Sequence, residues 1–295
     1  MTFNDNARVD SSRVQRRRGG RPGVVAGGSI GGIGLMIVLF LASQWLGVDL
    51  TGLANTVGAS QSATVTDEQI AFDECKTGAD ANEDDECRMA AAAAALDTYW
   101  AGQLDGYREP QVVLFRGSTQ SACGTASNQT GPFFCPLDEG IYIDTEFYEL
   151  LRTQFGAEGG PLSQMYVLAH EWGHHIQHIT GQLDQRDRQT GADSMQVRIE
   201  LQADCYAGAW IGAAATLKDA NGTTFLKPIT EAQKRDALSA AAAVGDDHIQ
   251  QQAGQQINQD SFTHGTSEQR QRWLTIGYEN GPRACNATTV PANQL

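Results

Sequence analysis

A long apolar stretch near the start of the chain most constrains what this sequence can fold into. Residues 22–48 contain no charged side chain, and the apolar part runs from about Val24 to Leu46. A helix needs about 20 such residues to cross the hydrocarbon core of a membrane. The stretch is long enough, and its glycines are tolerated in membrane helices. The sequence therefore predicts a single transmembrane helix over residues 24–46.

The charges on either side of this stretch predict an orientation. Residues 1–23 contain six arginines and two aspartates, whereas the whole chain has a net charge of −14. Because positive charge stays on the cytoplasmic side, we expect residues 1–23 to be a disordered cytoplasmic tail. A Gly- and Ser-rich linker at 47–66 then leads to an extracytoplasmic domain at 67–295. A cleaved signal peptide is the alternative, but its apolar run is usually shorter.

The composition favours a folded domain over a fibrous or disordered chain. Hydrophobic residues make up 41% of the 295 residues and charged residues 19%, which is enough to bury a core. The acidic balance argues against nucleic-acid binding, because phosphate groups need lysine and arginine opposite them. The sequence leaves the oligomeric state open.

All six cysteines follow the apolar stretch. An even number of cysteines outside the cytoplasm indicates disulfides, although six cysteines allow 15 pairings. We favour two local pairs and one long one, namely Cys75 with Cys87, Cys123 with Cys135, and Cys205 with Cys285. No CxxC spacing is present, so a structural zinc site is not expected.

The region after the linker combines short strand patterns with helix patterns. An alanine-rich run at 86–100 favours a helix, and residues 111–115 and 140–144 have the β-rich or alternating pattern of short strands. Thr145 is expected to cap the helix after the second strand, and Pro161 is typical of the first residue of another. Two early strands followed by a long helical portion predict an α+β domain.

Three later helices are predicted by capping boxes, in which an N-cap residue and the residue three positions later cap each other's backbone amides. The pairs are Asp193 with Gln196, Thr230 with Gln233, and Thr266 with Gln269. We expect the first of these helices to run to about Leu217.

Four of the six histidines lie between positions 170 and 178, in the sequence His-Glu-Trp-Gly-His-His-Ile-Gln-His. His170, Glu171 and His174 form the motif H-E-x-x-H on a predicted helix. Residues four apart lie on the same helix face, so the two imidazoles can bind one metal ion, for which zinc is the usual choice. Glu171 is turned by about 100° from His170, where it can accept a proton from water bound to the metal.

A catalytic zinc ion needs a third protein ligand. The third histidine of the HExxHxxGxxH motif is absent, since Gln177 and Thr180 occupy the positions of its glycine and histidine. Glu200 on the next helix is a suitable ligand, and Asp204, one turn further, can accept the Nδ1 proton of a ligand histidine. Cys205 is an alternative ligand, but an oxidising setting favours a disulfide there.

Five segments carry a resemblance to a known family: Gly131–Pro136, Ile141–Asp144, His170–Gln177, Glu200–Gly208 and Asp260–Arg270. With them, the chain from about Cys75 to the end resembles the bacterial membrane-anchored neutral zinc metallopeptidases. The resemblance implies a zincin-like fold, mostly helical with a small sheet, and a glutamate as third ligand, as in thermolysin-type enzymes. It implies the class of reaction more than the substrate.

We therefore expect a membrane-anchored zinc metallopeptidase of the HExxH-plus-Glu type that hydrolyses peptides or proteins outside the cytoplasm. Glu171 would act as general base, and His264 would donate a hydrogen bond to the oxyanion. The segment Thr263–Gly265 is similar to the Thr-His-Pro segment of related membrane metallopeptidases. Residues 141–144 are expected to pair with an extended substrate, and Arg270 to form a structural ion pair.

Two other functions fit the same residues. A catalytically silent zinc module tethered to the membrane would need a fourth protein ligand, for which His175, His178 and Cys205 are available. The intact Glu171 argues against this module, because metal binding alone needs no base. The third possibility is zinc-dependent hydrolysis of a non-peptide amide of the cell envelope.

Overall fold

A five-stranded sheet forms one half of the molecule in the computed structural model, which describes residues 2–18, 68–70, 72–127, 130–187 and 189–295. The strand order is β2-β1-β3-β7-β6, with β1, β3 and β7 parallel and the two outer strands antiparallel to their neighbours. The strands are β1 (Val14–Arg18), β2 (Glu68–Ile70), β3 (Gln111–Arg116), β6 (Phe133–Cys135) and β7 (Gly140–Asp144). A separate hairpin consists of β4 (Ser118–Ser121) and β5 (Gly124–Ser127).

The N-terminal residues belong to this sheet. β1 pairs in parallel with the whole length of β3, and Phe3 is fully buried. The Arg16 guanidinium lies 2.8 Å from the Glu74 carboxylate and 2.5 Å from that of Glu86. The prediction of a separate, disordered tail is therefore wrong for residues 2–18, the part of 1–23 that the structure describes. The arginines that suggested a cytoplasmic tail include one that pairs with acidic groups of the folded body.

The predicted single-pass membrane topology is also corrected. The expected transmembrane helix at 24–46 and the linker at 47–66 lie outside the described residues, and no helix within the described part is long and apolar enough to span a bilayer. A chain that crossed a membrane once between residues 18 and 68 would place β1 and β2 on opposite sides. These two strands instead pair with each other, so a cytoplasmic N-terminus joined to an extracytoplasmic domain is wrong.

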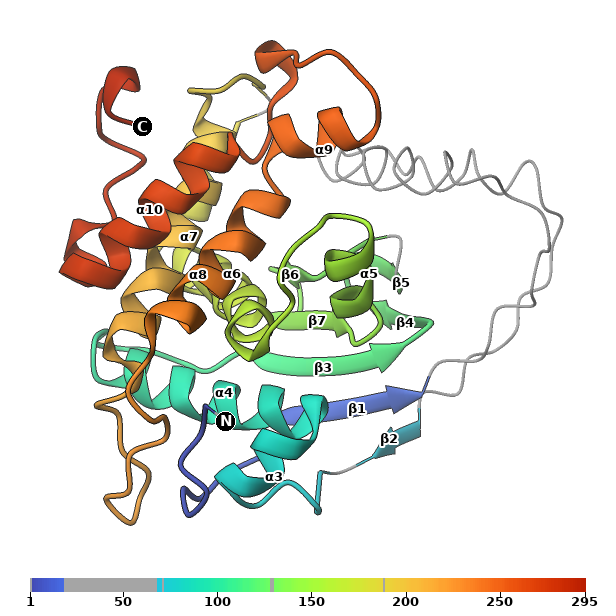
Figure 1. Cartoon of the computed structure of the whole chain (residues 1–295), viewed down its shortest axis with the longest axis vertical. Coiled ribbons are helices and arrows are strands. Elements are labelled where there is room, and N and C mark those ends of the chain that lie inside the picture. Colours follow the sequence, from blue (N-terminus) through green and yellow to red (C-terminus); the bar gives the residue numbers. More distant parts are fainter. Residues whose placement is uncertain (1, 19–67, 71, 128–129, 188) are drawn as a thin grey trace, which may run out of the picture.

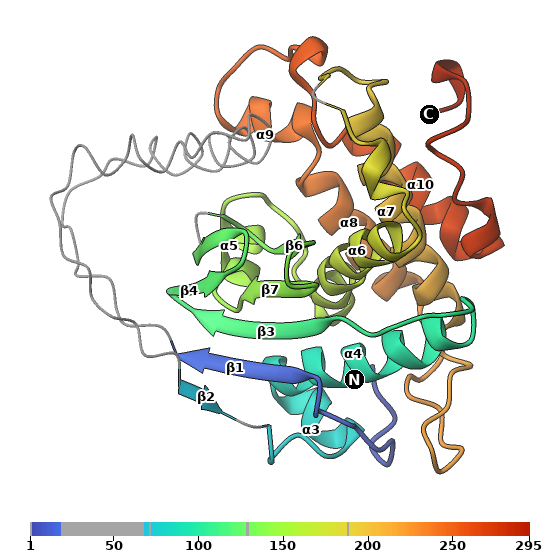
Figure 2. The same ribbon diagram turned by 180° about the vertical axis from the view of Figure 1, so that it is seen from behind.

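Helices form the other half of the molecule and confirm the α+β prediction. The described helices are α3 (Gly78–Glu83), α4 (Asp85–Ala101), α5 (Phe147–Thr153), α6 (Pro161–Ile179), α7 (Met195–Ala214), α8 (Glu231–Ala243), α9 (Asp246–Gln252) and α10 (Ser267–Asn280). Both views show α6 between the strands on one side and α7, α8 and α10 on the other (Figures 1 and 2). The expected helix at 86–100 and strands at 111–115 and 140–144 are present.

The capping boxes at Thr230 and Thr266 are confirmed, but two predicted caps are wrong. Ser194 rather than Asp193 caps α7, which ends at Ala214, three residues before Leu217. Thr145 caps no helix, because the Asp144 carboxylate accepts the Glu146 amide at 2.9 Å and α5 begins only at Phe147. Asp, Ser and Thr are all good N-caps, so adjacent candidates compete for the same helix end.

The helix that carries the HExxH motif begins at Pro161, as predicted, but its cap comes from another helix. Asp236 of α8 accepts the backbone N–H of Gly160 at 2.8 Å, of Leu162 at 3.1 Å and of Ser163 at 3.0 Å. A carboxylate in this position satisfies otherwise unpaired amides and interacts favourably with the helix dipole. The cap thus fixes the start of α6 against α8.

Close packing holds α6 against α7. A Cβ atom at Gly173 would lie 3.0 Å from both the Cα and the carbonyl oxygen of Ala203, which is tighter than most Cβ contacts, so glycine favours this approach. Gly173 precedes His174, and Ala203 lies between Glu200 and Asp204 on α7. The close approach therefore places the histidines of one helix opposite the carboxylates of the other.

The three predicted disulfides are present. They join Cys75 to Cys87, Cys123 to Cys135, and Cys205 to Cys285. The last ties α7 to the C-terminal segment across 80 positions of the sequence. Disulfides of this kind are typical of proteins folded in an oxidising environment.

Candidate active site

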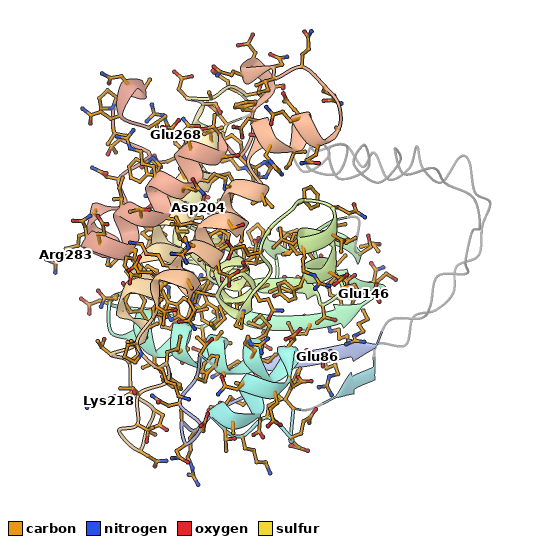
Figure 3. The ribbon with its side chains drawn as sticks, in the orientation of Figure 1. Glu86, Glu146, Asp204, Lys218, Glu268 and Arg283 are labelled. Atoms are coloured by element: carbon orange, nitrogen blue, oxygen red, sulfur yellow. A yellow bond between two sulfur atoms is a disulfide. The ribbon has the colours of Figure 1, made fainter. Side chains whose placement is uncertain are left out.

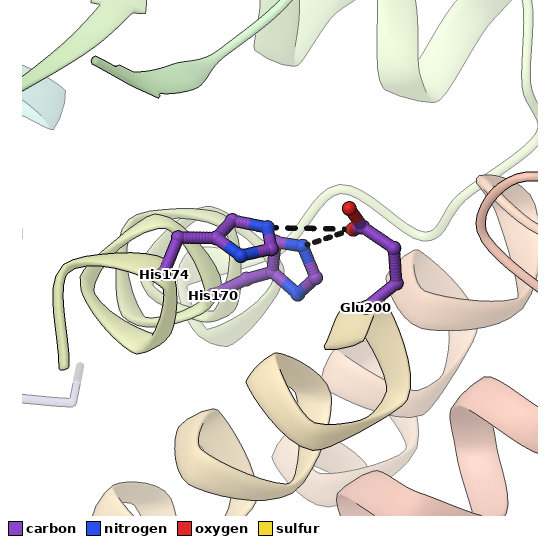
Figure 4. A group of neighbouring side chains, drawn as sticks. All are labelled: His170, His174 and Glu200. Atoms are coloured by element: carbon purple, nitrogen blue, oxygen red, sulfur yellow. Dashed lines mark hydrogen bonds and ion pairs between the residues drawn. The ribbon is translucent and has the colours of Figure 1, made fainter. Parts of the chain in front are cut away.

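His170 and His174 of α6 converge on Glu200 of α7. The Nε2 atoms of the two histidines lie 3.2 and 3.3 Å from the same Glu200 carboxylate oxygen, Oε2. Figure 4 shows both imidazole rings pointing toward this carboxylate. The three residues offer ligand atoms that lie within 4.8 Å of one another.

Asp204 fixes the orientation of His170. Its Oδ1 lies 2.8 Å from His170 Nδ1, and it accepts hydrogen bonds from the Tyr166 hydroxyl and, over 2.8 and 2.9 Å, from Arg270. Asp204 is fully buried within the helical half (Figure 3). Because the ionised carboxylate can only accept hydrogen bonds, His170 Nδ1 must donate. In the neutral ring, the lone pair of His170 Nε2 therefore faces Glu200.

A chain of amides fixes His174 in the same way. Its Nδ1 lies 2.9 Å from the Gln177 side-chain oxygen. The nitrogen of the same Gln177 amide donates to the Ile199 carbonyl at 2.7 Å and to Gln202 at 3.0 Å. This nitrogen is thereby committed, so the Gln177 oxygen faces the ring and His174 Nδ1 donates to it. The Nε2 lone pair of His174 is then also directed at Glu200.

The donor set fits a tetrahedral zinc ion. Zinc binds histidine nitrogen and carboxylate oxygen at about 2.0–2.2 Å, which separates two ligand atoms of a tetrahedron by about 3.3–3.6 Å. The separations of 3.2 and 3.3 Å between the histidine nitrogens and the Glu200 oxygen are close to the short end of this range, and all three ligand atoms lie within 4.8 Å of one another. His170, His174 and Glu200 are therefore placed so that they could hold one zinc ion.

Burial disfavours the charged forms of Asp204, His170 and Glu200, but neighbouring groups of opposite charge together have a larger effect on their pKa values. Burial raises the pKa of Asp204, but the Arg270 guanidinium and His170 hold it at about 2. Burial lowers the pKa of His170, yet the Asp204 and Glu200 carboxylates raise it overall to about 9. Burial raises the pKa of Glu200, but His174 and His170 keep it well below its usual value. The cluster therefore attracts positive charge, from a proton on an imidazole or from a metal cation.

A cavity of about 450 Å³ opens beside these three residues, and Glu171 forms part of its wall. The Glu171 side chain is largely buried, and within the described part of the chain its carboxylate makes no hydrogen bond or ion pair. Much of the remaining wall is apolar and aromatic, from Phe133, Phe134, Phe147, Phe155, Val167 and Ile249. The cavity thus combines a few polar groups with an apolar lining, as ligand-binding sites commonly do.

His264, in the loop before α10, lines the same cavity. Asp246 Oδ2 accepts the backbone N–H of Thr263, His264 and Gly265 over 2.6–2.9 Å, and Asp246 Oδ1 lies 3.4 Å from His264 Nδ1. Burial lowers the pKa of His264, but the Asp246 and Glu200 carboxylates raise it above its ordinary value. Asp246 therefore positions the loop and favours the protonated form of the ring.

The residues considered as a fourth ligand are engaged elsewhere. His175 Nε2 donates to the Arg108 carbonyl at 2.7 Å, and burial lowers the pKa of this histidine. His178 Nε2 lies 3.5 Å from a Glu139 oxygen, and Cys205 is in a disulfide. A metal ion held by the three converging residues would keep an open position, which a catalytic zinc site requires.

The strand predicted to pair with substrate lies inside the sheet. β7 has β3 along its whole length on one side, and β6 pairs with Gly140–Tyr142 on the other. The prediction that residues 141–144 bind an extended substrate is therefore wrong for Ile141 and Tyr142, whose hydrogen-bonding edges are both used. β6 is the outer strand, and its residues Phe133 and Phe134 line the cavity.

Several supporting side chains were missed by sequence reasoning. Gln177 follows His174 by three positions and Gln196 precedes Glu200 by four, so helical spacing carried a signal for both. Asp246 comes from a separate helix, and no local pattern relates it to the motif. Arg270 forms the expected structural ion pair, and its partner is Asp204.

Comparison with known proteins shows which family the chain is similar to. Residues 3–288 match the family described as "Putative neutral zinc metallopeptidase". An uncharacterized protein of Mycobacterium tuberculosis (strain H37Rv), Rv2575, is 45% identical over 248 residues, which is 82% of this chain and 83% of that protein. The uncharacterized protein YpfJ of Escherichia coli K12 is 36% identical over 298 residues, 95% of this chain and 96% of that protein. No solved structure matches the chain at a significant level. The chain therefore belongs to this family of neutral zinc metallopeptidases.

Proposed function

We propose that this chain is a zinc-dependent peptidase in which His170, His174 and Glu200 hold the metal ion. One observation carries the proposal. Both histidines use Nδ1 as a donor, so two nitrogen lone pairs and a carboxylate oxygen meet at one point. When the imidazoles are neutral, three such groups repel one another unless a proton or a metal cation lies between them. Within this family, zinc is the cation that the site is expected to take.

Glu171 is proposed as the general base. Zinc, when bound, would polarise the scissile carbonyl and lower the pKa of a water molecule. The Glu171 carboxylate lines the same cavity and is not committed to another group in the described part of the chain. It can therefore accept a proton from the attacking water and deliver it to the leaving amine.

His264 is proposed to stabilise the negative charge that develops on the carbonyl oxygen. Its Nδ1 is directed to Thr263 and Asp246, at 2.8 and 3.4 Å, which leaves Nε2 for the substrate. The raised pKa favours the protonated ring, and a protonated ring can donate from Nε2. A hydrogen bond that forms fully only in the transition state contributes to rate rather than to substrate affinity.

The cavity favours peptide substrates with large apolar side chains. Its aromatic and aliphatic wall would bury such a side chain next to the scissile bond, and each buried methylene would contribute about 0.8 kcal/mol of binding free energy. Unfolded proteins expose side chains of this kind and are suitable first substrates.

Removal of the metal ion tests the proposal. We expect the purified full chain to contain one zinc ion per molecule and to cleave an unfolded protein such as carboxymethylated casein. Treatment with 1,10-phenanthroline should abolish cleavage, and added zinc should restore it. His170→Ala should lose zinc, whereas His248→Ala should retain it, because His248 instead bonds the Phe155 carbonyl. Cleavage that persists after complete removal of zinc would contradict the proposal.

A further inference from the structure

Two arginines, Arg270 and Arg186, line the cavity, and they differ in exposure and in hydrogen bonding. Arg270 is 3% exposed, and its nitrogens donate to Asp204, Tyr166 and the Val244 carbonyl. Arg186 is exposed and donates its Nε–H to the side-chain oxygen of Gln196. In the described part of the chain, the two terminal nitrogens of Arg186 make no further hydrogen bond or ion pair. Arg186 therefore keeps most of its donors available at the wall of the cavity.

Gln196 holds Arg186 at a defined distance from the proposed metal ligands. Gln196 is 2% exposed and lies one turn before Glu200 on α7. Its side-chain oxygen accepts from Arg186, and its nitrogen donates to Glu200 Oε1 at 3.3 Å. One amide and two hydrogen bonds thus separate the guanidinium from the Glu200 carboxylate, a distance of about 8 Å at most.

We propose that Arg186 binds a carboxylate of the peptide substrate, close to the scissile bond. The inference rests on the proposed peptidase function and specifies its substrate. A guanidinium binds a carboxylate through two parallel N–H donors, and the terminal nitrogens of Arg186 can supply such a pair. A carboxylate bound to the terminal nitrogens lies up to about 5 Å beyond Nε. Because an extended peptide spans about 3.3–3.6 Å per residue, the carboxylate lies within about four residues of the bond that is cut.

The charged groups of the cavity wall leave Arg186 available to an anion. The other acidic residues of the wall, Glu171 and Glu200, are assigned to proton transfer and metal binding, and neither forms an ion pair with Arg186. The remaining wall is largely apolar and, among the described residues, offers Arg186 no competing carboxylate. The carboxylate can come from the C-terminus of the substrate or from an aspartate or glutamate side chain, and the experiment below separates these sources.

A binding measurement tests the inference without requiring cleavage. The probe is a fluorescent pentapeptide rich in phenylalanine and leucine, prepared with a free C-terminus, with a C-terminal amide, or with the amide and one internal glutamate. The zinc-loaded Glu171→Gln protein is the parent, and Arg186→Gln, Arg186→Lys and Arg152→Gln are made in it. Arg152 is an exposed arginine outside the cavity wall and serves as the matched control.

We expect Arg186→Gln to weaken binding of a carboxylate-bearing peptide by about 10- to 100-fold, as for loss of a charged hydrogen-bonded pair. Arg186→Lys should retain part of this affinity, and Arg152→Gln all of it. The peptide that loses affinity identifies the carboxylate source. Equal weakening of all three peptides, or a loss of zinc in Arg186→Gln, would show that Arg186 only supports Gln196 and would overturn the inference. Failure of the proposed function is seen separately, as absence of cleavage by the wild-type protein.

Discussion

Asp204 has no contact with solvent, yet it determines which nitrogen His170 directs toward Glu200 and the proposed metal site. The Asp204 carboxylate is shared by His170, Tyr166 and Arg270, so its negative charge serves two functions. It keeps the proton of His170 on Nδ1, and it neutralises the buried Arg270 guanidinium. Loss of the charge should therefore weaken both metal binding and folding.

We predict that Asp204→Asn weakens zinc binding by about 10- to 100-fold. The free energy of unfolding should fall by about 3–5 kcal/mol, because Arg270 would remain buried without its partner. Competition with a chelator of known affinity measures the first effect, and urea unfolding measures the second. The exposed Asp105→Asn is the control. An Asp204→Asn protein with unchanged zinc affinity would refute the proposed role.

A second buried carboxylate makes stability depend on pH. Asp144, at the end of β7, is fully buried, and burial raises its pKa from an ordinary 3.8 to about 6. The folded protein therefore holds this proton more tightly than the unfolded chain does. The resulting contribution to stability is complete below pH 4 and is lost as the pH rises through 6.

Asp144→Asn, which cannot ionise, should remove this loss of stability. We expect the variant to have a higher Tm than wild type at pH 8, by roughly 2–4 °C for each kcal/mol regained, and an equal Tm at pH 4. Thermal unfolding followed by circular dichroism at both pH values measures the difference. A difference in Tm that is the same at both pH values would contradict the assigned pKa.

Much of the site was predictable at the residue scale because helical periodicity is local. The spacing of His170 and His174, and of Glu200 and Asp204, places each pair on one helix face. The contributions of Asp236, Asp246 and Arg186 could not be predicted, since each reaches its partner from a different segment of the chain. Their positions depend on how the helices and the intervening loops pack together.

At the scale of elements, the contact between α7 and α10 depends on glycine. A Cβ at Gly277 of α10 would lie 1.9 Å from the Cys205 carbonyl oxygen, and one at Gly208 of α7 would lie 2.0 Å from that of Leu274. These backbones approach too closely for any side chain. The contact keeps Arg270 of α10 beside Asp204 of α7.

We predict that Gly277→Ala lowers the free energy of unfolding by about 1–3 kcal/mol, since the helices must separate to admit a methyl group. Zinc affinity should fall as well, because Arg270 moves with α10. Gly102→Ala is the matched control, as its nearest neighbouring atom would lie at 3.5 Å. Urea unfolding of both variants gives the comparison. Equal stabilities would show that α7 and α10 tolerate a wider spacing.

Element boundaries illustrate what the sequence determines locally. Two capping boxes were predicted because each has a threonine followed three residues later by a glutamine that completes the reciprocal cap. The start of α7 was displaced by one residue because Asp193 and Ser194 are adjacent and both suit an N-cap. Local chemistry thus predicts that a helix begins, but packing selects between neighbouring caps.

At the scale of the whole molecule, the sheet joins segments that are far apart in the sequence. β1 lies between β2 and β3, and the sequence separates it from both by many residues. A run of arginines next to an apolar stretch is typical of a membrane anchor. The strand β1, which contains some of these arginines, was therefore not predicted. Strand pairing over such a distance leaves no periodic signal, so the sequence alone could not predict it.

The central claim is that Glu171 acts as the base of a zinc peptidase. The most direct measurement compares zinc content and cleavage of carboxymethylated casein for the wild-type chain and Glu171→Gln. Gln is nearly isosteric with Glu but cannot accept the proton, so both proteins should bind one zinc ion, while the variant should lose at least about 100-fold in rate. Equal cleavage by the two zinc-loaded proteins, or no cleavage by either, would contradict the account.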